Sequence, residues 1–243
     1  MDKAPIQYRE LSSPVSVQAE LTPRCNNLCN YCYNAWRGEK EFEKELSLED
    51  YSSIAKKLIQ NDIFEVILTG GEPLLRKDLV YPLASYLRRN NIEVGLNTNM
   101  VLLKQGDIPK IIDSGINKVL GSLPSYDEKA YNKITQTKNY KRALNGLELL
   151  AGGGVPTAIN MVVEQENKNQ VYDTGKFVYE RGIHIFSGTP ALPSPFLSSN
   201  QELSSADIIH TLDELLKLEN DFGMRADILE PIPMCFFCKP RKV

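Results

Sequence analysis

The sequence predicts an α/β fold in which six strand–helix units form a partial (β/α)6 TIM-like barrel with a short C-terminal extension. Apolar stretches with the two-residue period of strands alternate with stretches of helical period, and the connections are short. This alternation implies parallel strands, because each helix supplies the crossover to the next strand. Polar motifs follow several successive strands, which is typical of barrels, whereas an open sheet gathers them at one switch point. We expect a lead-in over residues 1–14, the barrel over 15–220 and a tail over 221–243.

The first half of the barrel carries clear local signals. Residues 15–21 alternate apolar and polar side chains and run into a cysteine-rich loop. Ser47, followed three residues later by Asp50, is the pattern of a helix start, and apolar residues then recur at helical spacing to residue 58. The next predicted elements are a strand over 64–69 that ends at a glycine pair, a helix over 79–89 and a strand over 92–96.

The second half repeats the alternation. A helix over 108–114 is closed by Gly115, which is typical of a left-handed helix end. Ser204 and Asp207 predict the start of a last helix, which reaches residue 218. Between these two helices we expect strands over 118–123, 157–163 and 183–186, and helices over 126–134, 140–150 and 170–180.

Composition indicates a globular protein of the cytoplasm. Of the 243 residues 42% are hydrophobic and 24% charged, and the net charge of −3 gives no reason to expect nucleic acid as a partner. No apolar stretch approaches the roughly 20 residues that span a bilayer, and the N-terminus lacks the apolar run of a signal peptide. Because cytoplasmic thiols stay reduced, five cysteines that include a tight triplet favour a metal site over disulfides.

The triplet is Cys25, Cys29 and Cys32, which have three and then two residues between them. Three thiols are one short of the four that saturate a tetrahedral zinc or an ordinary four-iron cluster. If they hold a four-iron cluster, one iron keeps an open position that a substrate or cofactor can occupy. Two other interpretations remain open from the spacing alone, namely a zinc loop completed from elsewhere in the chain and a set of unrelated thiols.

The triplet, with Tyr31 directly before its last cysteine, resembles the C-x3-C-x2-C cluster loop of the radical S-adenosylmethionine (radical SAM) enzymes. This resemblance implies a partial barrel and a 4Fe-4S cluster whose open iron chelates the amino and carboxyl groups of S-adenosyl-L-methionine. It also implies an external electron donor of the flavodoxin or ferredoxin type. One electron then splits the sulfonium and gives a 5′-deoxyadenosyl radical, which abstracts a hydrogen atom from the substrate.

A second motif, Gly70–Gly71–Glu72–Pro73, ends the second predicted strand. The glycines let backbone pass close to a ligand, Pro73 fixes the turn, and the carboxylate of Glu72 suits an amino group. The alternative is an ordinary turn with a solvated acid. The motif matches the GGEP segment of the radical SAM family, which contacts the methionine amino group, and it lies in the same order along the chain.

Other positions resemble the family more loosely. Asn97 and Thr98, in a segment similar to the family's "TNG", would bond ribose or carboxylate, or cap a turn. Ser122 matches a serine that contacts the methionine carboxylate, and Lys133 stands where an arginine counter-ion is common. Met161 is a candidate to flank the adenine, although core packing explains it as well.

Two further features have open interpretations. His184 lies between two isoleucines on a predicted strand and is a candidate catalytic side chain, or simply a packed imidazole. Cys235 and Cys238 form a C-x-x-C near the end of the chain and hold either a second iron–sulfur cluster or two plain thiols. Their proline-rich approach resembles the SPASM/twitch region of peptide-modifying radical SAM enzymes, in a truncated or short form, although molybdenum-cofactor enzymes share a similar cysteine set.

The resemblance favours an enzyme that modifies a ribosomally made peptide or protein. The alternatives are a radical SAM enzyme acting on a small cofactor precursor and a non-catalytic protein that only carries metal or a cluster. A zinc-dependent hydrolase ranks lowest, because such sites favour histidine and neither histidine lies near the triplet in the sequence. A peptide substrate would call for a leader-binding or partner protein, since residues 1–14 are too few to form a leader-binding domain.

Overall fold

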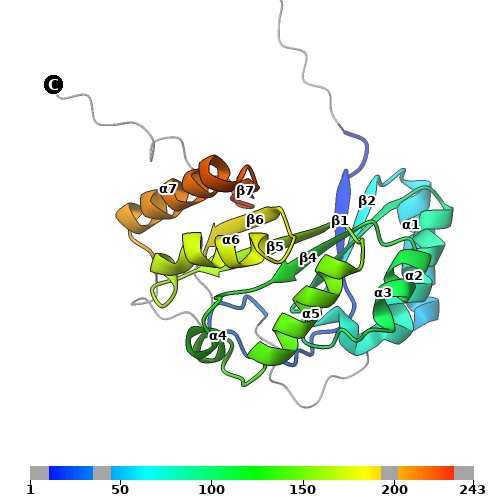
Figure 1. Ribbon diagram of the computed structural model, residues 1–243. Coiled ribbons are helices and arrows are strands. Elements are labelled where there is room, and N and C mark those ends of the chain that lie inside the picture. Colours follow the sequence, from blue (N-terminus) through cyan, green and yellow to red (C-terminus); the bar gives the residue numbers. More distant parts are fainter. Residues whose placement is uncertain (1–10, 35–44, 193–201, 233–243) are drawn as a thin grey trace, which may run out of the picture.

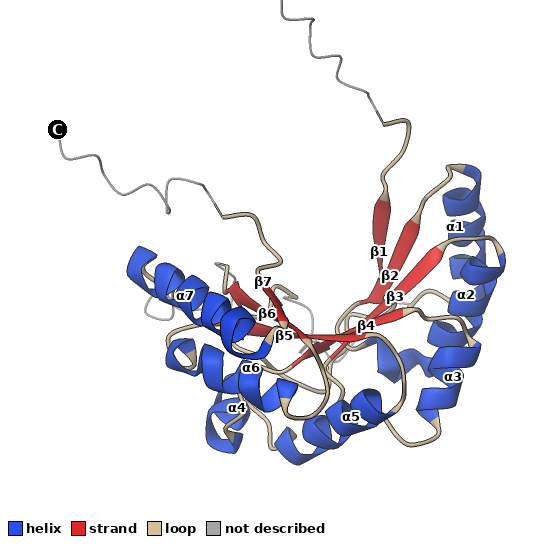
Figure 2. Cartoon of the chain, turned by 45° about the horizontal axis from the view of Figure 1, so that its top comes forward, coloured by secondary structure: helices blue, strands red, loops and turns tan. Residues whose placement is uncertain are grey.

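The computed structural model describes residues 11–34, 45–192 and 202–232. In this part of the chain seven parallel strands form one sheet in the order β1 to β7. The sheet is curved, and the helices cover its outer face (Figures 1 and 2). The first and last strands each pair with one neighbour, so the described sheet is an open arc rather than a closed barrel. The predicted α/β partial barrel is confirmed.

The strands are short, and the helices that connect them run from two to five turns. The strands are β1 (Ser16–Glu20), β2 (Glu65–Thr69), β3 (Glu93–Thr98), β4 (Lys118–Ser122), β5 (Thr157–Val163), β6 (Ile185–Pro190) and β7 (Arg225–Asp227). The α-helices are α1 (Leu48–Gln60), α2 (Lys77–Arg89), α3 (Asp107–Asp113), α4 (Glu128–Thr135), α5 (Tyr140–Gly152), α6 (Val171–Tyr179) and α7 (Ser205–Phe222). Two 3-10 turns, η1 (Pro73–Arg76) and η2 (Lys168–Gln170), precede α2 and α6.

Both predicted helix-start signals form complete capping boxes. At α1, the Asp50 backbone N–H donates to Ser47 Oγ at 3.2 Å, and the Ser47 N–H donates to the Asp50 carboxylate at 2.8 Å. Ser204 and Asp207 repeat this exchange at α7. Each box satisfies two of the backbone donors that a helix start leaves without partners.

Apolar packing between sheet and helices holds the layers together. Leu68 and Leu96, from adjacent strands, are 0% and 1% exposed, and both belong to one continuous core cluster. Truncation of such a buried leucine to alanine typically costs about 2–5 kcal/mol, whereas an exposed ion pair contributes about 0–1 kcal/mol. The scaffold that positions the strand ends is therefore held by packing rather than by surface charge.

The parallel register brings the carboxyl ends of the strands to one rim. Ser16 pairs with Glu65 and Glu20 with Thr69, so β1 and β2 end side by side. The same in-step pairing continues from β2 to β5, where Ser122 at the end of β4 pairs with Asn160 of β5. Side chains just after these strands therefore meet, although they lie far apart in the sequence.

Two strand assignments differ from the sequence prediction. The strand expected over 183–186 runs instead from Ile185 to Pro190. Ser187, Gly188 and Thr189 are small or polar, so they do not look like strand residues in the sequence, although they are buried in the structure. In addition, β7 pairs in parallel with β6, so the sheet continues into the range expected to be a tail. Three residues with mainly exposed side chains are too few to carry a period-2 signal.

Candidate active site

The cysteine loop begins where β1 ends and lies on the rim formed by the strand ends. Leu21 N–H donates to Thr69 O at 2.9 Å, which extends the pairing of β1 with β2 by one bond. The chain then leaves the sheet and carries Cys25, Cys29 and Cys32 across the rim. All three thiols are partly buried and line one pocket.

The glycine pair after β2 holds the first part of this loop. Gly71 N–H donates to Thr22 O at 2.7 Å and Glu72 N–H to Arg24 O at 2.8 Å. A Cβ on Gly71 would lie 2.1 Å from Arg24 O, and one on Gly70, whose φ is +136°, would lie 2.5 Å from Thr22 O. Both positions therefore require glycine, and the backbone that they approach is the cysteine loop itself.

Glu72 is a buried acid, 1% exposed, so the alternative of a solvated turn acid does not hold. Its carboxylate accepts hydrogen bonds from Thr98 Oγ1 at 2.7 Å, the Asn99 N–H at 2.8 Å and the Leu74 N–H at 3.1 Å. Burial raises the pKa of Glu72 to about 7, and these donors oppose the rise. Glu72 thus links the end of β2 to the end of β3.

Tyr31, within the loop, connects it to the end of β4. Its hydroxyl interacts with the Ser122 side chain and the Cys29 thiol. Burial, and then the neighbouring Cys29, raise the pKa of Tyr31 well above its usual value, so the phenol stays protonated. A neutral hydroxyl in this position can donate to a thiolate or to a bound carboxylate.

The pocket on the rim has a volume of about 380 Å³, within the range of small-molecule sites. It brings together side chains from the loop and from the ends of β2, β3 and β4 that are distant in the sequence. The sequence-predicted residues that line it are Cys25, Cys29, Tyr31, Cys32, Gly70, Gly71, Glu72, Asn97, Thr98 and Ser122.

Three residues that were predicted to bind the cofactor lie outside this set. Pro73 is buried at the start of η1, directly behind Glu72, and serves the turn. Lys133 is exposed on α4 and forms an ion pair with Glu166 at 2.5 Å. Met161 is fully buried, but it alternates along β5 with the pocket-lining Asn160 and Val162 and therefore points toward the helices. The structure thus favours the core-packing alternative for Met161 over a position beside the adenine.

His184 lies away from the pocket. It directly precedes β6, at the amino end of that strand, where its exposed ring packs edge-on against Tyr179 at a centroid distance of 5.1 Å. The pocket lies at the carboxyl end of the sheet. The catalytic role expected for His184 therefore has no geometric basis.

Several lining residues were not singled out from the sequence. The sequence prediction places Met161 rather than Asn160 and Val162 at the site, and it does not reach Thr189 because the predicted strand ends at residue 186. Asn99 follows the recognised Asn97–Thr98 pair and donates from its amide to Asn26 Oδ1 at 2.8 Å and to Cys25 Sγ at 3.7 Å. The remaining lining residues that the sequence did not indicate are Asn27, Tyr33, Thr69, Leu120, Gly121, Pro190, Ala191, Leu192, Leu229 and Glu230.

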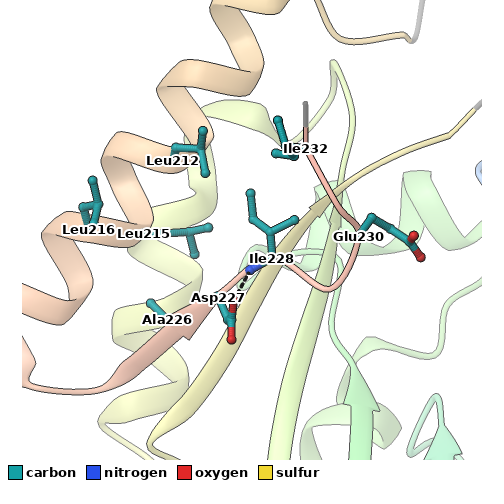
Figure 3. A pocket seen from close by; sticks show the side chains of 8 residues that line it. All are labelled: Leu212, Leu215, Leu216, Ala226, Asp227, Ile228, Glu230 and Ile232. Atoms are coloured by element: carbon teal, nitrogen blue, oxygen red, sulfur yellow. Dashed lines mark hydrogen bonds between the residues drawn. The ribbon is translucent and has the colours of Figure 1, made fainter. Parts of the chain in front are cut away.

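A second, smaller hollow of about 240 Å³ lies between α7 and the segment that follows β7 (Figure 3). Leu212, Leu215 and Ile228 give it an apolar lining. Glu230 borders both hollows, and its carboxylate points away from the leucines of α7. Cys235 and Cys238 lie outside the described residues, so a second cluster there stays a prediction.

The donor set around the loop fits an iron–sulfur cluster. Two N–H donors face Cys25 Sγ, namely the Asn99 side-chain amide and the Asn27 backbone N–H at 3.4 Å. Such donors stabilise a sulfur that carries negative charge. Burial raises the pKa of the Cys25 thiol to about 11, so a bound cation would have to supply the charge that deprotonates it. Within the described residues, no three His, Cys, Asp or Glu side chains are placed to bind one metal ion.

A three-thiol loop over the carboxyl rim of an open parallel barrel, held by a Gly–Gly–Glu–Pro turn, defines the class of protein. The chain belongs to the radical SAM superfamily, whose sequence model matches residues 19–178. The membership confirms the resemblance inferred from the cysteine loop and implies S-adenosylmethionine and a 4Fe-4S cluster as cofactors.

Among its relatives, the chain is 32% identical over 158 residues to a probable GTP 3′,8-cyclase of Methanococcus maripaludis, with 64% of this chain and 52% of that protein aligned. It is 30% identical over 172 residues to the PqqA peptide cyclase of Gluconobacter oxydans, with 70% and 48% aligned. Streptococcus suis SuiB bound to the precursor peptide SuiA has the same fold, with a TM-score of 0.80 at 17% identity over 93% of this chain and 51% of SuiB. The chain spans about half the length of these relatives. None of the helices in the described ranges has the length and apolar character needed to cross a membrane.

Proposed function

We propose that this protein is a radical SAM enzyme that reductively cleaves S-adenosylmethionine and modifies a ribosomally made peptide or protein. One observation carries the proposal: three thiols share a pocket with Glu72, Asn97, Thr98 and Ser122, which come from the ends of three successive strands. When bound at the thiols, a 4Fe-4S cluster supplies the electron for this cleavage, and its chemistry belongs to the cofactor rather than to the protein.

The residues of the chain then bind, orient and shield. Cys25, Cys29 and Cys32 hold the cluster. Glu72 and its partner Thr98 line the pocket and would suit an amino group, and Ser122 with Tyr31 offers hydroxyls to a carboxylate. Because Glu72 is already anchored by three donors, its carboxylate is held in one orientation before any ligand arrives.

Two observations support a peptide substrate. SuiB, which has this fold, is known bound to its precursor peptide, and PqqA peptide cyclase is a sequence relative. In addition, none of the described residues that line the pocket is Lys, Arg or His. Recognition of a triphosphate relies on such cations, so a nucleotide substrate would need to be bound by residues other than this described lining.

A second candidate function follows from the sequence relatives. The 32% identity to a probable GTP 3′,8-cyclase favours a small nucleotide-like precursor as the substrate. The two candidates share the cofactor chemistry and differ in what occupies the mouth of the pocket. An external electron donor, a leader-binding or partner protein, a second cluster at Cys235 and Cys238, and a cytoplasmic location are part of the proposal with either substrate.

The test begins with anaerobic reconstitution with iron and sulfide, followed by reduction in the presence of S-adenosylmethionine. The wild type should release methionine and 5′-deoxyadenosine, and Cys29→Ala should not. Release by Cys29→Ala equal to the wild type would refute the cluster assignment. GTP and the peptide encoded nearest the gene are then offered separately. A mass change in the peptide alone supports the first candidate, and consumption of GTP alone supports the second.

A further inference from the structure

Asn139 occupies the N-cap of α5 but does not cap it. An asparagine at this position ordinarily accepts a hydrogen bond from a backbone N–H in the first turn of its helix. Here no such bond forms. The amide instead donates to Asn26 O at 3.2 Å and to Asn27 Oδ1 at 2.9 Å, both in the cysteine loop. The side chain is therefore committed to a segment more than one hundred residues away in the sequence rather than to its own helix.

The end of the preceding helix contacts the same loop. Leu28 N–H donates to Thr135 O at 2.9 Å, and Asn30 N–H donates to Ile134 O at 3.1 Å. These are carbonyls of the last turn of α4, which have no partner inside their own helix. The carboxyl end of α4 and the turn into α5 thus hold the second half of the loop, whereas the glycine pair holds its first part.

The contact made by Asn139 leads directly to the thiols. Asn27, which accepts from Asn139, is 2% exposed, and its backbone N–H lies 3.4 Å from Cys25 Sγ. Thr137, two residues before Asn139, also donates to Asn27 Oδ1, at 3.4 Å. A shift of Asn27 would therefore move the N–H that faces the sulfur, and with it the backbone between Cys25 and Cys29.

We propose that Asn139 is a positioning residue for the cysteine loop, which it holds with the three thiols facing one pocket before any cluster is bound. This inference rests on the proposed function only in taking the loop to be the cluster site. Asn139 touches neither a thiol nor the pocket, so it acts through Asn26 and Asn27.

Variants that can still cap α5 but cannot donate from an amide distinguish a role in positioning the loop from a role in stabilising the helix. Aspartate and serine cap helices about as well as asparagine, so Asn139→Asp and Asn139→Ser leave α5 with a competent N-cap. Neither can supply the amide N–H, and the aspartate adds a third acceptor beside Asn26 O and Asn27 Oδ1. Asn90→Asp is the matched control, because Asn90 also donates from its amide to a carbonyl, Tyr86 O at 2.8 Å, but at the end of α2.

The experiment measures three quantities on full-length chains. Without metal, the rates at which iodoacetamide alkylates Cys25, Cys29 and Cys32 are followed by peptide mass spectrometry. After anaerobic reconstitution, iron retention is measured during dialysis against a chelator. Thermal unfolding of the metal-free protein reports whether the fold is intact.

For Asn139→Asp we expect several-fold faster alkylation of the loop thiols and roughly 10-fold faster loss of iron, with a Tm like that of Asn90→Asp. Alkylation and iron retention equal to those of Asn90→Asp would overturn the proposal. If Asn139→Asp fails to fold, Asn139→Ser decides by the same two measurements. A wild type that takes up no iron would refute the proposed function, whereas the alkylation rates would still test Asn139.

Discussion

The carboxylate of Glu72 accepts a hydrogen bond from the backbone N–H of Asn99 at 2.8 Å, and this bond joins the ends of β2 and β3 directly beside the cysteine loop. The Asn99 side chain continues the connection, because its amide lies 3.7 Å from Cys25 Sγ. An acid expected from its motif to meet a cofactor amine is therefore also part of the support of the cluster loop. Changes at Glu72 should affect both.

Replacement of Glu72 by glutamine should destabilise the metal-free protein. One oxygen of Glu72 accepts from Thr98 and Leu74, and the other accepts from the Asn99 N–H. In glutamine an NH2 group replaces one of these oxygens, so at least one buried donor loses its acceptor. A buried donor left unsatisfied costs about 1–3 kcal/mol, and chemical denaturation should show a loss of unfolding free energy of this size. Unchanged stability together with weaker S-adenosylmethionine binding would mean that Glu72 serves the cofactor alone.

Gly71→Ala should displace the first part of the cysteine loop. Its Cβ would lie 2.1 Å from Arg24 O, and because that neighbour is backbone, the loop itself has to move. We expect a loss of about 1–3 kcal/mol in unfolding free energy, typical of overpacking, and poor cluster retention after reconstitution. Gly152→Ala is the control, since a Cβ at Gly152, the last residue of α5, meets nothing within 4 Å. Equal iron content in the two variants would contradict the role given to Gly71.

Met100 stands where the related "TNG" segment has its glycine, and the structure gives a physical reason for that glycine. The φ of Met100 is +66°, in the left-handed region, which costs a side-chain-bearing residue about 1–2 kcal/mol. Its side chain is nonetheless fully buried, and Gly121 leaves room for it, since a Cβ on Gly121 would lie 2.5 Å from Met100 Sδ. Gly146 leaves room for the backbone of Met100, since a Cβ there would lie 2.2 Å from Met100 O.

Met100→Gly is therefore expected to destabilise the fold despite relieving the backbone. Removal of a buried methionine side chain costs about 2–5 kcal/mol, which exceeds the 1–2 kcal/mol of strain released. Denaturant unfolding should show a net loss of roughly 2 kcal/mol, within a range of about 0–4 kcal/mol by this difference. A stabilised Met100→Gly protein would show that the strain outweighs the packing.

Local signals in the sequence were sufficient for much of the fold and for the centre of the site. The capping pair Ser47 and Asp50 and the spacing of the three cysteines depend on residues close together in the chain, where a pattern is visible. The bonds from Glu72 to Asn99 and from Asn139 to Asn27 join residues 27 and 112 positions apart, and no periodicity reports them. The first bond depends on the pairing of β2 with β3, and the second on the contact between the start of α5 and the cysteine loop.

Strand orientation was the other limit. β5 carries apolar side chains on both faces, because Val162 lines the pocket while Met161 and Val163 pack against helices. Because apolar residues occur on both faces of β5, the sequence alone does not tell which face meets the site. The sequence prediction places Met161 beside the adenine, whereas Asn160, one residue earlier, lines the pocket.

Glu164, at the end of β5, should prove more important for the cysteine loop than its neighbour Glu166. Glu164 is 0% exposed and accepts from Asn30 Nδ2 at 3.0 Å, between Cys29 and Cys32, and burial raises the pKa of Glu164 above its usual value. In the described part of the chain Asn30 Oδ1 already lacks a partner, so Glu164→Ala would leave this buried amide with less support still. We expect a loss of about 1–3 kcal/mol in unfolding free energy and faster loss of iron.

The matched control is Glu166→Ala, which removes only an exposed ion pair with Lys133 and should cost about 0–1 kcal/mol. Glu164→Gln keeps an oxygen that can accept from Asn30, so it should restore most of the stability and iron retention that Glu164→Ala loses. Equal behaviour of the Glu164→Ala and Glu166→Ala proteins would show that the loop does not depend on β5. Failure of Glu164→Gln to rescue would mean that the negative charge of Glu164, rather than its acceptor oxygen, is what the loop requires.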